Sequence, residues 1–348
     1  MANFDFLKAK RPWSKTEINE LGEYFAGLTD MPPEAAEMIY WHDELARRTA
    51  AACDDFTREL FGREGHQPDI VSAYRVKSQS TIGDKIRRSQ TDSSAKVQLG
   101  RMWDFAGARI TANVLHDDLR YLAYELRRQL VSEGHRVNER DYIARAQPGG
   151  YRAHHLVIRS TAGIVELQLR TLLQSEWANT FEKLADKTGR RIRYESNYRP
   201  DTEELSKVVD ALGSIAQDIN DMERLRASGN RQGMASMRDL MTIPPGLPLD
   251  PGLHELRSRA FDALSRSETA AGEHASRILS LIESLRVLSQ SLSADVTEGE
   301  CRTWNTSSSC LTGKPANVRS RNTEIRVRRS CSVSLKSNPT TTLMLRLW

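Results

Sequence analysis

Apolar positions recur with a helical period in the first part of the chain. The spacing predicts helices over residues 15–28 and 32–62. In the second helix the apolar positions are Met38, Ile39, Leu45, Phe56 and Leu60. Its two leading prolines suit the first turn, where the missing N–H groups cost nothing. The chain therefore opens on a helical segment.

The period shortens from about Val71 onward. Short apolar or alternating runs predict strands at 71–77, 106–114, 153–159 and 164–170. Helix-like stretches separate these runs, the clearest being 117–133. Alternation of strands with helices is typical of an α/β core, in which helices cover a β-sheet.

After Arg193 the pattern returns to helix. One apolar stripe runs from Leu205 to Met222 and another from Ile278 to Leu292, on either side of the Pro- and Gly-rich linker 243–252. Stripes of this kind pack against a core or bind a partner, and the pattern leaves both open. Beyond residue 298 the chain is rich in Ser, Thr, Asn and Arg with little periodicity, which predicts disorder or weak structure.

Composition agrees with a soluble protein of one sizeable α/β domain with helical additions, or of two small domains. The 348 residues are 39% hydrophobic and 28% charged. No apolar run approaches the roughly 20 residues that cross a bilayer, and the N-terminus lacks the apolar stretch of a secretory signal. We therefore expect a cytoplasmic protein that does not enter a membrane.

The formal charge of +4 is unevenly distributed. Residues 299–348 contain nine Lys/Arg and two Glu, a net charge of +7, so that residues 1–298 carry −3. An acidic body does not favour general binding of nucleic acid through charge. The basic tail is either a solvated segment or a source of RNA contacts.

The strictly alternating segment 164–171 carries the most chemical information. As a strand it places Glu166, Gln168 and Arg170 on one face and apolar side chains on the other. A carboxylate, an amide and a guanidinium in a row suit a site that handles phosphates, a metal and a hydroxyl group. Taken alone, the same pattern is equally an amphipathic edge strand.

Cations gather upstream of this segment. Arg75 and Lys77 alternate, and Lys85 and Arg88 follow within one short stretch. Arginine binds phosphates through bidentate hydrogen bonds and lysine as a point charge. A cluster of this kind, taken alone, is more often the solvated face of a helix.

Two further positions suggest ligands. Asp104 stands just before the apolar run 106–114, and together with Glu166 it could share a magnesium ion with bound phosphates. A single aspartate at such a boundary is also a common cap. Downstream, the glycine turn at Gly150 presents Tyr151, whose ring offers a face on which a base can stack.

Seven short motifs follow one another in a characteristic order: R-V-K, S/T-I-x-x-K, D-x-x-G-x-R, D-Y-I, G-Y-R-x-x-H, E-x-Q-x-R-T and W-A. Each is weak alone, but together they resemble the synthetase domain of the RelA/SpoT family, as found in small alarmone synthetases. The resemblance covers roughly residues 70–195. The His-Asp metal motif of the family's hydrolase domain does not occur, so only the synthetase is implied.

The resemblance implies an α/β (α+β) fold. We expect a nucleotidyltransferase-like domain with a mixed sheet of about five strands flanked by helices, and extra N- and C-terminal helices. The resulting divisions are a helical lead-in (1–69), the synthetase core (70–195), a helical extension (196–242), the linker (243–252), a C-terminal helical segment (253–298) and the basic tail (299–348).

The resemblance also implies roles for individual residues. The expected ATP-binding set is Arg75, Lys77, Thr81, Lys85, Arg88 and Arg109. Asp104 and Glu166 would be the catalytic residues and would hold Mg²⁺, with Glu166 also activating or orienting the acceptor hydroxyl. Tyr151 would stack on the acceptor's purine, and His155, Gln168 and Arg170 would shape the site around it. Trp177 is expected to be a packing residue.

Several departures from the family pattern lie on the acceptor side. Ala146 and Gln147 stand where the family has Pro-Lys, Ala153 where it has Ser, Arg140 where Lys is common, and Lys183 where His follows Glu. The residues expected to bind ATP are nearly intact. ATP as donor is therefore the stronger inference, and the acceptor stays open.

Three functions follow as hypotheses. In the first, the protein transfers the β,γ-pyrophosphate of ATP to the 3′-hydroxyl of a purine nucleotide, making (p)ppGpp or a (p)ppApp-type alarmone. In the second, the acceptor is the 3′-end of tRNA and the protein is a toxin that blocks translation, in a toxin–antitoxin or phage-defence system. In the third, it is a non-catalytic nucleotide-binding module. The helical segments would supply a surface for an antitoxin or for a second copy of the chain.

Overall fold

The computed structural model describes residues 2–241 apart from 64, 66, 92–95, 189, 194–198 and 201–202, together with 305–307 and scattered single positions between 255 and 283. The helices and strands are α1 (Lys15–Phe25), α2 (Ala35–Arg63), β1 (Ile70–Val76), α3 (Gln79–Thr91), β2 (Ala106–Ala112), α4 (His116–Ser132), β3 (Arg136–Asp141), β4 (His154–Arg159), β5 (Ile164–Thr171), α5 (Leu172–Thr188), α6 (Glu203–Met241) and β6 (Asn305–Ser307). Short 3₁₀ turns lie at η1 (Asp5–Lys8), η2 (Leu99–Arg101), η3 (Pro148–Gly150) and η4 (Arg190–Arg193).

The strands form one mixed sheet in the order β3-β4-β5-β2-β1-β6. Strands β2 and β5 run parallel, and all other neighbours are antiparallel. The predicted mixed sheet flanked by helices is confirmed. It has six strands because residues 305–307 of the basic tail pair with Ser72–Tyr74 of β1. The linker 243–252, most of 253–298 and the rest of the tail lie outside the described residues.

The predicted strands correspond to β1, β2, β4 and β5, but sequence patterning did not reveal β3. Its sequence, Arg-Val-Asn-Glu-Arg-Asp, is nearly all polar. β3 lies at the edge of the sheet, pairs only with β4, and leaves most of its side chains exposed. A strand that buries neither face shows no apolar alternation.

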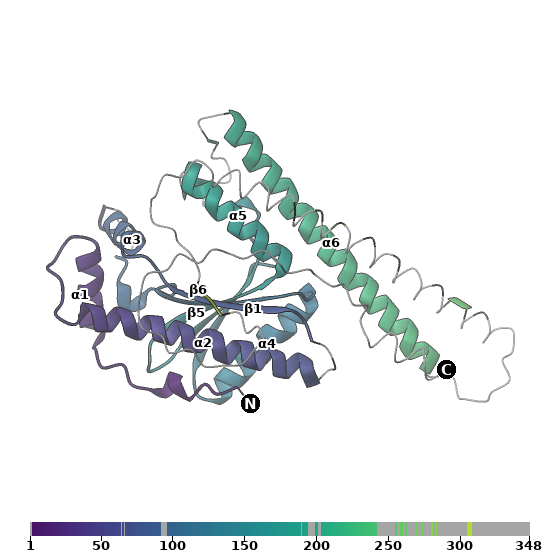
Figure 1. The fold of residues 1–348 in the computed structure, drawn as a ribbon, viewed down its shortest axis with the longest axis horizontal. Coiled ribbons are helices and arrows are strands. Elements are labelled where there is room, and N and C mark those ends of the chain that lie inside the picture. Colours follow the sequence, from purple (N-terminus) through teal and green to yellow (C-terminus); the bar gives the residue numbers. More distant parts are fainter. Residues whose placement is uncertain are drawn as a thin grey trace, which may run out of the picture.

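Helices cover both faces of the sheet (Figure 1). Helices α2 and α4 cover one face, where Val165, Leu167 and Leu169 of β5 belong to the main apolar core. Helix α5 lies over the other face, and α6 packs along α5. Because side chains alternate along a strand, the second face of β5 presents Glu166, Gln168 and Arg170 towards α5. The sheet thus has one apolar face, covered by α2 and α4, and one polar face, which is covered by α5.

The helix α5–α6 pair is held by its own apolar cluster. Trp177 is buried, and its ring stacks on that of Phe181 with centroids 4.8 Å apart. Its indole Nε1 donates to the Leu212 carbonyl of α6 at 2.8 Å. The predicted packing role of Trp177 is confirmed.

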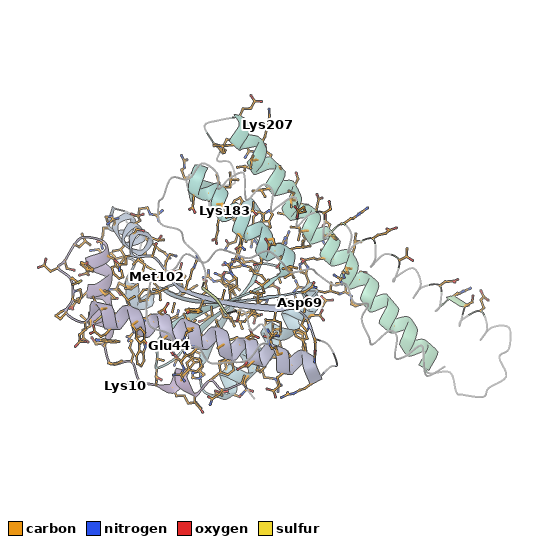
Figure 2. The ribbon with its side chains drawn as sticks, in the orientation of Figure 1. Lys10, Glu44, Asp69, Met102, Lys183 and Lys207 are labelled. Atoms are coloured by element: carbon orange, nitrogen blue, oxygen red, sulfur yellow. The ribbon has the colours of Figure 1, made fainter. Side chains whose placement is uncertain are left out.

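A third apolar cluster fixes the position of α3. It lies between α1, the start of α2, α3 and the segment that leads into β2, and includes Met102, labelled in Figure 2. Helix α1 begins with a capping box between Ser14 and Glu17, which satisfies backbone N–H groups of its first turn. Among the described helices, none has the length and low charge required to span a bilayer.

Candidate active site

The register of the sheet places the predicted residues in two rows across its polar face. In the first row, Arg75 of β1 is paired with Gly107 of β2, which is paired with Glu166 of β5. Adjacent strands lie about 4.8 Å apart, so the Cα atoms of Arg75 and Glu166 are roughly 10 Å apart. Gly107 has no side chain, which leaves the space between the cation and the carboxylate free of a side chain from β2.

The second row lies two residues further along β5. Arg109 of β2 is paired with Gln168 of β5, which is paired with His155 of β4. His155 is in turn paired with Arg140 of the edge strand β3. The sheet therefore brings together residues that are separated by up to 93 positions in the sequence, from Arg75 to Gln168.

Glu166 accepts hydrogen bonds from two sides. His155 Nδ1 lies 3.1 Å from Glu166 Oε1, and Gln168 Nε2 donates to Oε2 at 3.0 Å. Arg170 is linked to both of these partners of Glu166. Its Nη2 donates to Gln168 Oε1 at 2.8 Å and to the Tyr151 hydroxyl at 2.9 Å. The hydroxyl in turn lies 2.7 Å from His155 Nε2. Glu166 and Arg170 are thus joined by a closed ring of hydrogen bonds.

This environment keeps Glu166 ionised. Burial acts to raise its pKa, but the hydrogen bond and charge of His155, the hydrogen bond of Gln168 and the charge of Lys77 outweigh burial and lower the pKa to about 2. Near neutral pH the side chain is a carboxylate. Such a group suits metal coordination and the orientation of a hydroxyl donor better than lasting acceptance of a proton.

Three guanidinium groups converge on the same face. Arg170 is 1% exposed and Arg109 4% exposed, and Arg75 is partly buried. Burial lowers the pKa of Arg109 strongly, and the charges of Arg170 and Arg75 lower it further. Burial likewise lowers the pKa of Arg75, with Glu182 opposing and Arg170 reinforcing the effect. Buried cations that repel one another favour a bound anion.

The unpaired donors of Arg170 independently support binding of an anion at this face. Its Nε and Nη1 atoms are buried and form no hydrogen bond with the residues that the structure describes. Unsatisfied buried donors of a charged group are costly. A polyanionic ligand would satisfy them.

Asp104 lies among lysines. Lys77 Nζ donates to Asp104 Oδ2, and Lys85 Nζ lies 3.6 Å from Oδ1. The Asp104 side chain is 29% exposed, so a ligand has access to it. The structure therefore brings Lys77 and Lys85 together around one carboxylate, from the end of β1 and from α3.

Two of the predicted ATP-binding residues lie at the margin of this group. The Thr81 hydroxyl is 2.7 Å from Ser78 Oγ, in the first turn of α3. Arg88 is exposed near the end of α3, and its Nε donates to the Asp84 carbonyl one turn earlier. The structure does not place Arg88 in the buried cationic group. Its predicted contact with ATP stays a prediction.

Helix α5 contributes site residues that sequence reasoning missed. Asn179 Oδ1 accepts from Arg109 Nη1 at 3.0 Å, and Ser175 Oγ lies 3.1 Å from Thr111 Oγ1. Glu182 acts through its charge on both Arg75 and Arg109. The three are spaced i, i+4 and i+7, which places them on one face of a helix. That spacing was the available signal.

The edge of the site is aromatic. Tyr142 lies edge-on to both Tyr151 and His155, with ring centroids 6.2 and 5.0 Å apart. Arg140 Nη1 donates to the Tyr142 hydroxyl at 3.2 Å, and the same guanidinium stacks on Trp103 at 4.2 Å. Trp103, to which the sequence analysis assigned no role, extends this aromatic group towards the sheet edge.

The fold and this site define a class of protein in which buried cations and an ionised carboxylate share the polar face of a mixed sheet. Residues 74–191 match a family model described as "Region found in RelA / SpoT proteins". The predicted resemblance to the RelA/SpoT family is thereby confirmed for this part of the chain.

Similar proteins fall into two groups. A protein of Mycobacterium tuberculosis, described as uncharacterised, is 36% identical over 193 residues, which is 54% of this chain and 65% of that protein. The GTP pyrophosphokinase YwaC of Bacillus subtilis is 30% identical over 140 residues, 34% of this chain and 60% of that one. The chain thus spans about two thirds or less of the length of these relatives.

Among solved structures, the small alarmone synthetase 1 of Bacillus subtilis bound to its product pppGpp is similar in part. The match has 23% sequence identity and a TM-score of 0.42, and covers 57% of this chain and 98% of that one.

Proposed function

We propose that this protein is an ATP-dependent pyrophosphokinase, which transfers the β,γ-pyrophosphate of ATP to the 3′-hydroxyl of a purine nucleotide. One observation carries the proposal: Arg75, Arg109 and Arg170 converge on the same sheet face as the ionised Glu166. A purely structural face would not concentrate buried, mutually repelling cations beside an ionised carboxylate. The printed name of the Bacillus relative, GTP pyrophosphokinase, agrees with this activity.

The cations would bind the triphosphate. Arg75 and Arg109 would neutralise the transferring phosphates, with Lys77 and Lys85 at their edge. In the transfer, the acceptor 3′-oxygen bonds to the β-phosphorus as the bond between that phosphorus and the α,β-bridging oxygen breaks. AMP leaves with the bridging oxygen, and the hydroxyl proton passes to solvent or a nearby base. Such a reaction requires positioning and charge neutralisation more than covalent participation of the protein.

Asp104 and Glu166 would hold Mg²⁺ together with the phosphates. The described residues contain no cluster of three or more His, Cys, Asp or Glu side chains that could bind a metal alone. Mg²⁺ is usually held by one or two carboxylates plus substrate phosphates and water, which fits an accessible Asp104 and an ionised Glu166. When bound, the ion would neutralise charge that develops on the phosphates.

Glu166 would orient the acceptor hydroxyl. Its carboxylate is held from two sides by His155 and Gln168, so its direction is set before substrate arrives. Tyr151 would stack on the acceptor's purine. The hydrogen bonds of its hydroxyl to His155 and Arg170 would hold the tyrosine ring in place, and Gln168 would hold Arg170.

A second acceptor is favoured by one observation. Trp103 is flanked by two guanidiniums, Arg140 at 4.2 Å and Arg159 at 5.6 Å from its ring. Arginine beside an aromatic ring is a common arrangement for single-stranded nucleic acid. The 3′-end of tRNA could lie along this edge of the sheet, and the protein would then be a toxin of translation.

Label transfer distinguishes these functions. ATP labelled with ³²P at the γ-phosphate is incubated with Mg²⁺ and, in parallel, GDP, GTP, AMP, ATP or deacylated tRNA. Label on a free nucleotide establishes the first function and names the base. Label only on tRNA establishes the second. Absence of transfer to every acceptor, with ATP still bound, would refute both and support a non-catalytic module.

A further inference from the structure

Helix α6 lies outside the RelA/SpoT region yet contacts the loop that presents Tyr151. Gly150 has a backbone φ of +95°, and a Cβ built on it would lie 2.6 Å from the Cβ of Ala216 on α6. No side chain fits between them, so the loop backbone rests directly on the helix. Tyr151 itself packs against the apolar cluster of α5 and α6.

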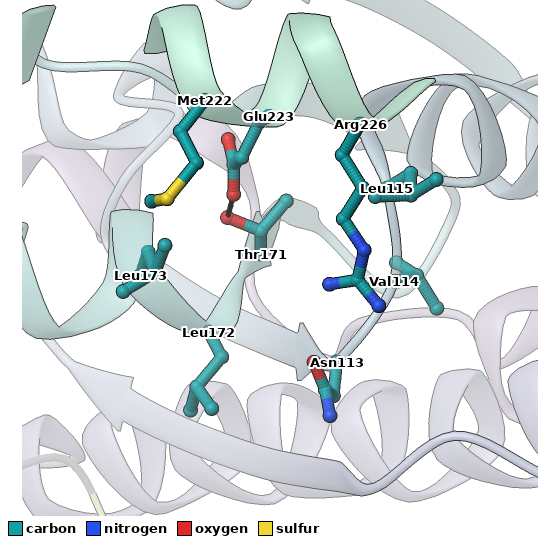
Figure 3. A pocket seen from close by; sticks show the side chains of 9 residues that line it. All are labelled: Asn113, Val114, Leu115, Thr171, Leu172, Leu173, Met222, Glu223 and Arg226. Atoms are coloured by element: carbon teal, nitrogen blue, oxygen red, sulfur yellow. Dashed lines mark hydrogen bonds between the residues drawn. The ribbon is translucent and has the colours of Figure 1, made fainter. Parts of the chain in front are cut away.

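The second contact anchors α6 at the end of β5. Glu223 of α6 is 5% exposed, and its carboxylate accepts from the Thr171 hydroxyl and, at 3.0 Å, from Gln174 Nε2. His116 Nε2 lies 2.5 Å from Glu223 Oε2. Figure 3 shows Glu223 pointing from α6 to Thr171. Both residues line a cavity of about 20 Å³, which has room for a single water. A carboxylate is buried so fully only when it is paired.

The position of this anchor matters because Thr171 ends the strand that carries Glu166, Gln168 and Arg170.

A third interaction is electrostatic: the charges of Asp221 and Glu223 on α6 act on Arg152, which follows Tyr151 in the loop. Arg152 Nη1 also donates to the Ile143 carbonyl at 2.7 Å. Helix α6 therefore contacts both the loop and the strand of the acceptor side.

We propose that α6 is a positioning element for the acceptor, acting through Ala216 on the loop and through Glu223 on the end of β5. This inference rests on the proposed pyrophosphokinase activity. The residues expected to bind ATP come instead from β1, α3 and β2, whereas α6 packs against α5, α4 and the turn η3. Disturbing α6 should therefore weaken use of the acceptor and spare ATP.

The test compares one substitution at two places on the same helix. Ala216→Leu inserts a side chain against Gly150, and Ala211→Leu makes the same change at an exposed position. Steady-state KM values are measured for ATP and for GDP, or for whichever acceptor the label-transfer assay identifies. Amide hydrogen exchange is followed across residues 147–152, where Gly150 N donates to the Gln147 carbonyl at 3.1 Å.

Ala216→Leu should raise the acceptor KM about 10- to 100-fold, since small misplacement of a substrate-positioning group is costly. The KM for ATP should change less than about 2-fold, and loop exchange should accelerate. Ala211→Leu should leave all three values at wild type. Equal changes in both KM values, or an unchanged acceptor KM with unchanged loop exchange, would overturn the inference.

Glu223→Gln provides a second variant, because it keeps the side-chain shape and removes the charge. It should shift the acceptor KM in the same direction as Ala216→Leu, and an unchanged value would count against the role of Glu223. If wild-type protein transfers pyrophosphate to no acceptor, the proposed function fails. Hydrogen exchange in the loop still reports whether α6 holds it, so the two failures are distinguishable.

Discussion

His155 Nδ1 lies 3.1 Å from Glu166 Oε1. An ionised carboxylate only accepts hydrogen bonds, so Nδ1 must carry a proton, while Nε2 lies 2.7 Å from the Tyr151 hydroxyl. Tyr151 in turn accepts from Arg170. The hydrogen bonds therefore link Arg170 through Tyr151 and His155 to Glu166, and couple the residue expected to bind the base to the carboxylate expected to orient the hydroxyl.

Glu166→Gln should abolish transfer and leave the fold intact. The amide is nearly isosteric, but it removes the charge that would hold the metal and orient the hydroxyl, and loss of such a group typically costs about 10²- to 10⁴-fold in rate. Label transfer and circular dichroism measure the two effects. Glu37→Gln, an exposed change on α2, serves as control. Retained activity in Glu166→Gln would remove Glu166 from the mechanism.

Two substitutions at Tyr151 should separate stacking from hydrogen bonding. Tyr151→Ala removes the ring and should raise the acceptor KM about 10- to 100-fold, because base–aromatic stacking contributes about 1–3 kcal/mol. Tyr151→Phe keeps the ring but breaks the chain to His155, and should lower kcat with little change in acceptor KM. Steady-state kinetics with varied acceptor measure both. If the Phe variant raised KM as much as the Ala variant, stacking would not be the role of Tyr151.

Arg109→Met should weaken ATP binding without destabilising the fold. A hydrogen bond to a charged group contributes about 1.5–3 kcal/mol, so affinity should fall about 10- to 100-fold. Replacement of a buried, repelled cation by an apolar side chain is often neutral or stabilising. Calorimetry with a non-hydrolysable ATP analogue and urea denaturation measure the two quantities, with the exposed Arg47→Met as control. A large loss of stability would show that Arg109 is structural.

His42 should make the protein sensitive to acid. The side chain is 3% exposed, Nδ1 lies 2.7 Å from the Met38 carbonyl, and burial lowers the pKa from 6.5 to about 4. Between these values only the unfolded state binds the proton. Stability therefore falls as pH drops from about 6.5 to 4, by about 3 kcal/mol in total, and this contribution is constant below that range.

His42→Gln keeps a donor for the Met38 carbonyl and removes the titration. Urea denaturation of both proteins at pH 7 and pH 5 checks the effect, and the variant should lose less of its unfolding free energy on acidification. Identical pH dependence of the two proteins would contradict the assignment to His42.

Much of this protein is readable from its sequence because the signals are local. Alternation in residues 164–171 already separates Glu166, Gln168 and Arg170 from their apolar neighbours, since side chains of a strand alternate between faces. The helical stripe from Leu205 to Met222 likewise predicts a helix with one buried side. The order of the short motifs, from Arg75 to Trp177, was sufficient to suggest the family, which the family model then matched.

Tertiary structure decided which distant residues meet. The parallel pairing of β2 with β5 aligns Gly107 with Glu166, and no local pattern specifies that partner or its register. Only the folded structure shows the role of the polar edge strand β3, which pairs with β4. The same is true of the stripe on α5, whose members face β1 and β2: Ser175, Asn179 and Glu182. Contact of Ala216 with Gly150 joins residues 66 positions apart. Sequence thus determined the faces of the elements that have an apolar pattern, and packing determined which faces meet, because burial acts on the whole chain at once.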